Sequence, residues 1–183
     1  MSANHQILDE KNKLLHTVSK EVTFPLSEKD RNLIFDAINY LKASQDEEIA
    51  EKCNLRAGMG LAFIQLGIPK RIFVIANKNE NSDTFEEHII INPIIIGESE
   101  ELIYVGEGEG CLSVNRPVEG IVPRCARVTV SYDDINGKRQ TIRVREEIAI
   151  AFQHEIDHLN GILFVDRIDK KDPFKNKDLY REI

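Results

Sequence analysis

The chain lacks the features that mark secreted and membrane proteins. It has three cysteines, Cys53, Cys111 and Cys125, and no Cys-x-x-Cys spacing. An odd number without that spacing argues against a disulfide framework. The first fifteen residues are polar and charged, without the apolar core of a signal peptide. The longest apolar run, at residues 89–96, is interrupted by asparagine and proline and is too short to span a membrane. We therefore expect a cytoplasmic protein with no membrane partner.

The chain also has fewer positively charged than negatively charged residues. Lysine and arginine together number 24, against 31 aspartates and glutamates, which gives a formal net charge of −7. Proteins that bind nucleic acid carry a basic patch or stripe, so no specific nucleic-acid site is expected here. No block of like charge is long enough to indicate an interaction tail. The acidity is better explained as a contribution to solubility.

Hydrophobic periodicity predicts helices near both ends of the chain and strands between them. Ser27 opens a helix in which the apolar positions 33, 34, 37, 38 and 41 recur at helical spacing, and a short helix is expected at 46–52. Asn136 and Gly137 indicate a hairpin. A last helix begins near Glu146 and ends before Gly161. Strands are expected at residues 71–76, 88–96, 101–105, 127–132 and 140–144.

These elements predict an α+β fold, with mixed or antiparallel strands packed around a central helix. With 183 residues, 42% of them hydrophobic, the chain can bury a core without disulfides. We expect residues 1–183 to form a single domain.

The last helix carries a His-Glu-x-x-His motif from His154 to His158. Histidines four residues apart lie on one face of a helix, so both imidazoles can reach one metal ion. Glu155 is suited to take a proton from a metal-bound water. The apolar stripe Ile148, Phe152, Ile156 and Leu159 supports the helix and leaves the histidines on another face. The alternative is a pair of surface histidines.

A catalytic site usually has a third protein ligand. One zinc-protease pattern has a third histidine downstream, but the residue at that position here is Phe164. Another pattern takes a glutamate from a downstream helix, but Glu182 is almost the last residue of this chain. The ligand is therefore expected upstream, where Cys111 follows two glycines, and a thiolate binds divalent metals strongly. The alternative for Cys111 is a buried core cysteine, which is the default for the other two cysteines.

Three segments in this order resemble the motifs of peptide deformylase: GMGLAFIQ at residues 58–65, EGCLS at 109–113 and QHEIDH at 153–158. Their spacing resembles the longer form typical of Gram-positive-type bacteria. The resemblance runs from the first helix to about Asp169, so the expected single domain is a deformylase-like catalytic domain.

The resemblance implies an activity and a set of partners. The enzyme is expected to remove the N-formyl group from the N-terminal formyl-methionine of newly made proteins, releasing formate. Its partners would be N-formyl-methionyl peptides and nascent chains, with the ribosome near its exit tunnel as a further candidate.

The resemblance also implies roles for particular residues. Cys111, His154 and His158 would hold a ferrous ion, although these donors also suit zinc, nickel or cobalt. Glu155 would be the acid–base. Gln65 and the backbone N–H of Leu112 would stabilise the oxyanion.

The substrate is expected to lie extended beside Gly58, Met59 and Gly60 and to pair with their backbone. Ile150 and Ala151 lie about one turn before His154 and are candidates, with Met59, for the wall of a methionine pocket.

Two features of the family pattern lead to structural predictions. Phe63 and Ile64 stand where the family usually has smaller residues or proline, and we expect Phe63 in the core, on the same side as Leu61 of an extended segment. The family also implies an ion pair between Glu109 and Arg124.

Three other functions remain open at this point. They are a zincin-type endopeptidase, a deformylase-like protein with lost activity or a changed acyl group, and a metal-binding protein without catalysis. Phe164 and the short chain disfavour the first, and Glu155 disfavours the last, since a structural site needs no general base.

Overall fold

The computed structural model describes residues 6–79 and 81–183. Helices near both ends of the chain flank a run of mostly antiparallel strands, an α+β arrangement that confirms the predicted fold class. The helices are α1 (Glu28–Ser44), α2 (Glu47–Cys53), α3 (Glu146–Leu159) and α4 (Phe164–Arg167), with 3-10 turns η1 (Lys13–His16), η2 (Phe63–Leu66) and η3 (Lys177–Leu179). The strands are β1 (Gly60–Ala62), β2 (Ile72–Lys78), β3 (Phe85–Glu98), β4 (Leu102–Tyr104), β5 (Arg124–Cys125), β6 (Arg127–Asp133), β7 (Arg139–Arg145) and β8 (Arg181–Glu182).

Five strands form an antiparallel sheet in the order β1-β2-β3-β6-β7. β6 and β7 are joined at the predicted hairpin, where Gly137 has a φ of 80°, a conformation that glycine adopts without a steric penalty. The five predicted strands are present as β2, β3, β4, β6 and β7, and the short strand β1 is an addition that was not predicted.

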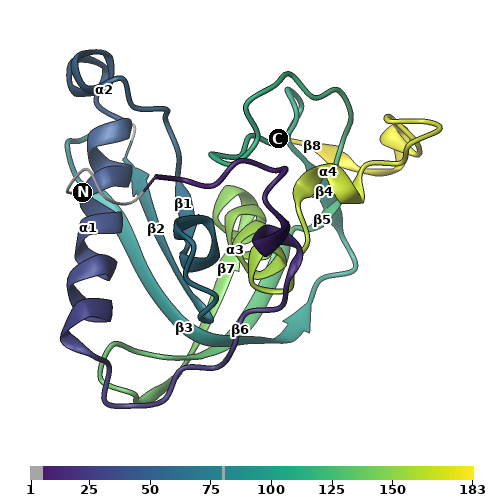
Figure 1. The fold of residues 1–183 in the computed structure, drawn as a ribbon. Helices are drawn as coiled ribbons and strands as arrows, with labels where there is room; N and C mark the ends of the chain where they lie inside the picture. Colours follow the sequence, from purple (N-terminus) through teal and green to yellow (C-terminus); the bar gives the residue numbers. More distant parts are fainter. Residues whose placement is uncertain (1–5, 80) are drawn as a thin grey trace.

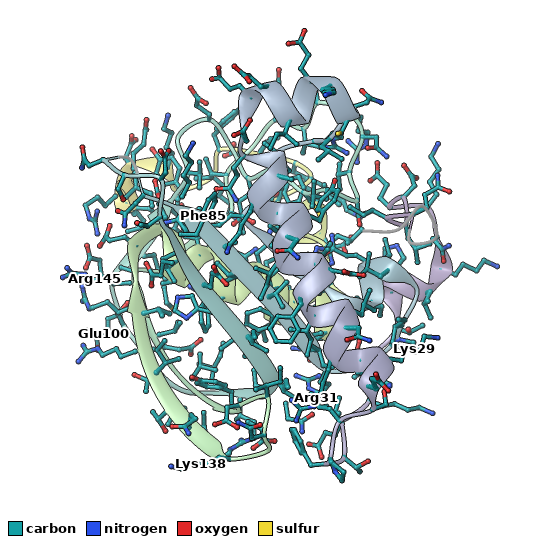
Figure 2. All side chains as sticks on the ribbon, turned by 90° about the vertical axis from the view of Figure 1, so that its left-hand side faces the viewer. Lys29, Arg31, Phe85, Glu100, Lys138 and Arg145 are labelled. Atoms are coloured by element: carbon teal, nitrogen blue, oxygen red, sulfur yellow. The ribbon has the colours of Figure 1, made fainter. Side chains whose placement is uncertain are left out.

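The sheet lies between two helices, with α1 on one face and α3 on the other (Figure 1). Side chains of β2 alternate between these faces: Phe73 and Ile75 pack with residues of α3, whereas Ile72 and Val74 pack with residues of α1. Figure 2 looks onto the α1 side, where the helix crosses the strands. Because both faces of β2 are covered, this strand is a nearly continuous apolar run.

The predicted N-terminal signal of α1 is confirmed. The Ser27 side chain accepts a hydrogen bond from the backbone N–H of Asp30 at 3.1 Å, which satisfies one of the free donors of the first turn.

The segment after β1 confirms one prediction and corrects another. Leu61 and Phe63 are fully buried on the α1 side, and Ala62 and Ile64 are fully buried on the α3 side. Phe63 therefore lies in the core, as expected. The segment is not extended throughout, however, because residues from Phe63 onward form the 3-10 turn η2.

A second, smaller sheet has the order β5-β4-β8. β8 runs parallel to β4, and its Arg181 forms ion pairs with Glu101 and Glu146. Sequence patterns do not predict β5 or β8, because a strand of two residues has no detectable alternation.

Helix α3 is the central helix. It ends with Asn160 as C-cap, followed by Gly161 at a φ of 75°, as the sequence predicts. Phe152 and Leu159 are fully buried, and His154 and His158 are also buried, at 9% and 1% exposure. The histidines are therefore not on a solvated face. Among the described residues, no helix is long and apolar enough to cross a membrane.

Candidate metal centre

A cleft of about 400 Å³ opens along α3. Its walls are the first turns of this helix, the chain that leads into β1, and the loop after β4. Ten of the eleven predicted site residues line it, and the eleventh, His158, is buried beside Cys111. The ten are Gly58, Met59, Gly60, Gln65, Cys111, Leu112, Ile150, Ala151, His154 and Glu155.

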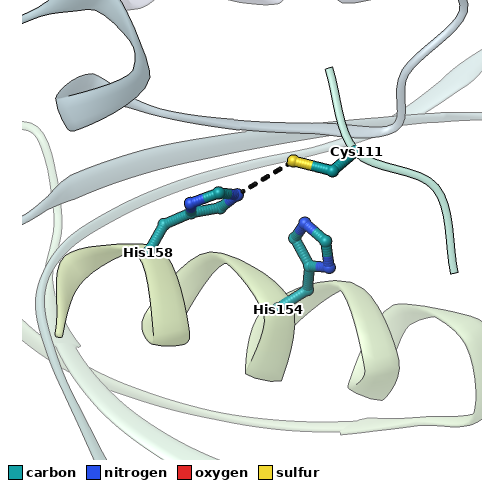
Figure 3. A group of neighbouring side chains, drawn as sticks. All are labelled: Cys111, His154 and His158. Atoms are coloured by element: carbon teal, nitrogen blue, oxygen red, sulfur yellow. Dashed lines mark hydrogen bonds between the residues drawn. The ribbon is translucent and has the colours of Figure 1, made fainter. Parts of the chain in front are cut away.

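Three side chains of types that could hold a metal ion converge beside this cleft. One donor atom from each of Cys111, His154 and His158 lies within 4.8 Å of the others. Both imidazoles project from α3 toward the thiol on the opposite loop (Figure 3). The sulfur is 3.3 Å from Nε2 of His158, and burial lowers the pKa of His158 well below its usual value. A neutral imidazole is the form that binds metal.

A buried ion pair orients His154. Its Nδ1 is 2.8 Å from Glu109, which leaves Nε2 for the metal-binding group. Arg124 donates to the two oxygens of Glu109 at 2.7 and 2.9 Å, so the predicted ion pair is confirmed. Burial opposes ionisation of Glu109, but hydrogen bonds from Arg124 and His154 outweigh it and lower the pKa of Glu109 to about 2. The carboxylate therefore remains charged and fixes the ring.

The sequence analysis missed Asp157, which continues this network. Its carboxylate accepts hydrogen bonds from Arg124 and from Arg167 of α4. The available signal was an acid inside the His-Glu-x-x-His motif, three residues after His154. Burial of such a charge requires partners, and both arginines lie outside α3, in β5 and α4, so no pattern in α3 identifies them.

Glu155 lines the cleft beside Gly60. The residue is 3% exposed, and Oε2 has no hydrogen-bond partner among the described residues. Burial raises the pKa of Glu155 to about 7. A Cβ atom on Gly60 would overlap the carboxylate. The absence of a side chain at position 60 therefore makes room for this group.

Gln65 is held by two hydrogen bonds. Its Oε1 accepts from the N–H of Ala62 at 2.9 Å, and its Nε2 donates to Ser113 Oγ at 3.1 Å. Nε2 also lies 3.7 Å from the sulfur of Cys111. Ser113 is a residue that the sequence analysis missed, although it is the last residue of the second motif.

Leu112 lines the same cleft. Its N–H donates none of the hydrogen bonds found within residues 6–79 and 81–183. Gln65 and Leu112 thus bring two amide groups to the region of Cys111.

The donor set fits a divalent metal. A thiol and two imidazoles form a three-ligand group of the kind that leaves a coordination position for water or substrate. The Nδ1 of His158 is buried without a partner among the described residues, so its ring is not committed elsewhere through that atom. Together with the adjacent buried Glu155, the site is that of a metal-dependent hydrolase.

Comparisons with known proteins identify the family within this class. The family model for polypeptide deformylase matches residues 4–174. The chain is 52% identical over 153 residues to the peptide deformylase of Oceanobacillus iheyensis, covering 84% of this chain and 83% of that protein. It is 48% identical over 181 residues to that of Streptococcus pneumoniae, covering 95% and 89%.

A similar solved structure is the Met-Ala-Ser-bound peptide deformylase of Acinetobacter baumannii, with a TM-score of 0.70, 29% identity, and coverage of 92% of this chain and 100% of that one. The chain belongs to the peptide deformylase family. It is a metal-dependent hydrolase that removes the N-formyl group from newly made peptides.

Proposed function

We propose that Cys111, His154 and His158 hold the catalytic metal and that Glu155 is the acid–base of deformylation. The observation that carries this proposal is the convergence of the three donor atoms within 4.8 Å, beside a buried carboxylate. A divalent ion bound there would lower the pKa of a water molecule and polarise the formyl oxygen.

Glu155 moves the proton in this proposal. Its unpartnered Oε2 accepts the proton of the attacking water and later delivers it to the amine nitrogen that leaves as the formyl carbon–nitrogen bond breaks. The products are formate and a peptide with a free N-terminus. Gly60 keeps the carboxylate in place because any larger residue would occupy the same volume.

Gln65 and the Leu112 amide stabilise the negative charge that develops on the formyl oxygen. The Ala62 and Ser113 contacts fix which end of the Gln65 side chain faces the cleft, so its amide nitrogen is presented as a donor. Donors that are held before the reaction stabilise the transition state without reorganising during the step.

The peptide lies extended beside Gly58, Met59 and Gly60 and pairs with backbone groups of this segment other than the Gly58 N–H and carbonyl, which already bond to Ser44 and Gln45. Gly58 and Gly60 both approach side chains on the facing walls, Leu112 and Glu155, so neither position has space for a side chain of its own.

The methionine side chain of the substrate occupies the apolar part of the cleft. Ile150 and Ala151 of α3 form one wall of this part, and Met59 forms another.

Iron is the proposed metal, with zinc, nickel and cobalt as ions that the same ligands accept in purified protein. Nascent chains with an N-terminal formyl-methionine are the proposed substrates, met in the cytoplasm near the ribosomal exit tunnel. Residues 1–183 act as one catalytic domain.

Glu155→Gln tests the assignment, because it keeps the shape of the side chain and removes the base. Turnover of a formyl-methionyl peptide should fall by a factor of about 100 or more, while metal content stays at the level of the unchanged protein. Formate release and metal analysis of anaerobically purified protein measure the two quantities. Near-normal turnover by this variant would refute the role of Glu155.

Substrate controls separate this function from its rivals. The unchanged enzyme should not cleave unformylated peptides, as an endopeptidase would. It should act on formyl-methionyl rather than acetyl-methionyl peptides, which excludes a changed acyl preference.

A further inference from the structure

Aspartate, glutamate, lysine and arginine side chains line the cleft at four positions: Arg56, Glu109, Glu147 and Glu155. Glu109 and Glu155 are inside, at 4% side-chain and 3% overall exposure respectively, and belong to the metal site. Arg56 and Glu147 are exposed. These two are therefore the charges that a bound peptide can meet beyond its formyl group.

Arg56 is committed to the protein framework. Its guanidinium donates to the backbone carbonyls of Cys111, Leu112 and Val114 at 3.0, 3.1 and 2.9 Å, and also to the side chain of Asn115. Both terminal nitrogens are used in these contacts. Arg56 holds the loop that carries Cys111 and has few donors left for a substrate.

Glu147 is the opposite case. Its carboxylate takes part in no hydrogen bond or ion pair found among residues 6–79 and 81–183. Arg143 and Arg145 border a neighbouring groove that Glu147 also lines, but neither comes within 4.0 Å of its carboxylate. Its negative charge is therefore available at the edge of the cleft.

The position of Glu147 relative to the metal group follows from helix geometry. One face of α3 lines the cleft. It carries Glu147 and the residues three, four and seven positions after it, which are Ile150, Ala151 and His154. Seven residues correspond to about 10 Å along the helix axis. The cleft wall thus runs from the metal ligand, past the apolar residues, to the carboxylate.

An extended peptide matches this order. Side chains of residues 1 and 3 point to the same side, residue 2 points to the other side, and the Cα atoms of residues 1 and 3 are about 7 Å apart. With the methionine of residue 1 against Ile150 and Ala151, the side chain of residue 3 is directed toward the same wall. It then reaches the level of Glu147.

We propose that Glu147 makes the enzyme favour formylated peptides with lysine or arginine as their third residue. This inference rests on the proposed function, because the metal end and the methionine pocket are taken from it. The second residue is not selected by Glu147, since its side chain points away from α3.

Four peptides with amidated C-termini test the inference: formyl-Met-Ala-Lys, formyl-Met-Lys-Ala, formyl-Met-Ala-Glu and formyl-Met-Ala-Ala. The kcat/KM for formate release should be about three- to fivefold higher for lysine than for glutamate at the third position, as expected for one exposed ion pair. The ratio should shrink in about 0.5 M salt, because exposed charges are screened. Formyl-Met-Lys-Ala should show no such gain over formyl-Met-Ala-Ala.

Variants assign the effect to one carboxylate. Glu147→Gln should bring the lysine-to-glutamate ratio close to one, and Glu147→Lys should invert it. Each ratio is measured within one enzyme, so a general change in activity cancels. Glu48→Gln is the matched control: Glu48 is also an exposed first-turn glutamate, on α2, but it does not line the cleft, so its variant should keep the original ratio.

Equal rates for lysine and glutamate at position 3 would overturn the inference, as would a ratio that survives in Glu147→Gln. A preference for lysine at position 2 instead of position 3 would overturn the placement of the peptide. Absence of formate from every formylated peptide would contradict the proposed function itself, and the inference with it.

Discussion

The contact between Gly60 and Glu155 ties a backbone position to a reacting group. Gly58 and Gly60 flank Met59, and two glycines around a single residue suggest either a tight turn or the close approach of another part of the chain. The structure shows a close approach, with the Glu155 carboxylate where a Cβ would be. The identity of residue 60 is thus set by a residue 95 positions later in the chain.

Gly60→Ala should displace the Glu155 carboxylate and leave the metal ligands in place. Misplacement of a reacting group by about 1 Å can cost about 100-fold in rate, so turnover should fall by about that factor with metal content unchanged. Gly97→Ala is the control, because a Cβ at position 97 makes only an ordinary 3.5 Å contact with Thr129. Normal turnover in Gly60→Ala would mean that the carboxylate has another productive position.

Individual residues differ in how far the sequence predicts them. Cys111, His154 and His158 were predicted from donor chemistry and order along the chain, and they converge in space. Ser113 and Arg56 were not, because their roles depend on which amide or carbonyl lies opposite. Such partners are set by the packing of separate segments and leave no periodic signal.

The η2 turn begins with two large side chains that pack on opposite faces of the sheet. Phe63 packs on the α1 side and Ile64 on the α3 side, so both side chains lie in the core and not in the cleft. This agrees with the predicted alternation, although the segment becomes a 3-10 turn at Phe63. Gln65 lines the cleft, and Phe63 and Ile64 are not among its lining residues.

Phe63→Ala should therefore change stability and not specificity. Removing a fully buried ring leaves a cavity, and the free energy of unfolding should drop by about 3–5 kcal/mol. Denaturant unfolding measures the loss, and the relative rates on several formylated peptides should match those of the unchanged enzyme. A shift in substrate preference with unaltered stability would place the ring in the substrate pocket.

Helix α3 and strands β2, β3, β6 and β7 were predicted within a few residues because their apolar side chains repeat over several turns or pleats, whereas the three-residue strand β1 was not predicted. The two-residue strands β5 and β8 have no such repeat. They form because each pairs with one edge of β4, which lies between them in the smaller sheet.

Over the whole molecule, the site joins segments that are distant in the chain. The Cys111 loop faces α3. The N-terminal segment bonds to both sides of the site: the backbone N–H of Leu8 donates to the carbonyl of Gln65 at 2.8 Å, and that of Glu10 donates to the carbonyl of Ser113 at 2.7 Å. No sequence pattern predicts these contacts of the N-terminal segment, since nearly every residue has a backbone N–H donor. A metal ion between Cys111 and α3 would add a further link between these segments.

X-ray absorption at the metal edge tests the central claim most directly, because it counts the ligands of the bound ion. The protein loaded with metal should show one sulfur and two imidazole nitrogens, contributed by Cys111, His154 and His158. Cys111→Ser should lose the sulfur signal, and Cys125→Ser should keep it. A spectrum of the unchanged protein without sulfur, or a sulfur signal that persists in Cys111→Ser, would contradict the assignment.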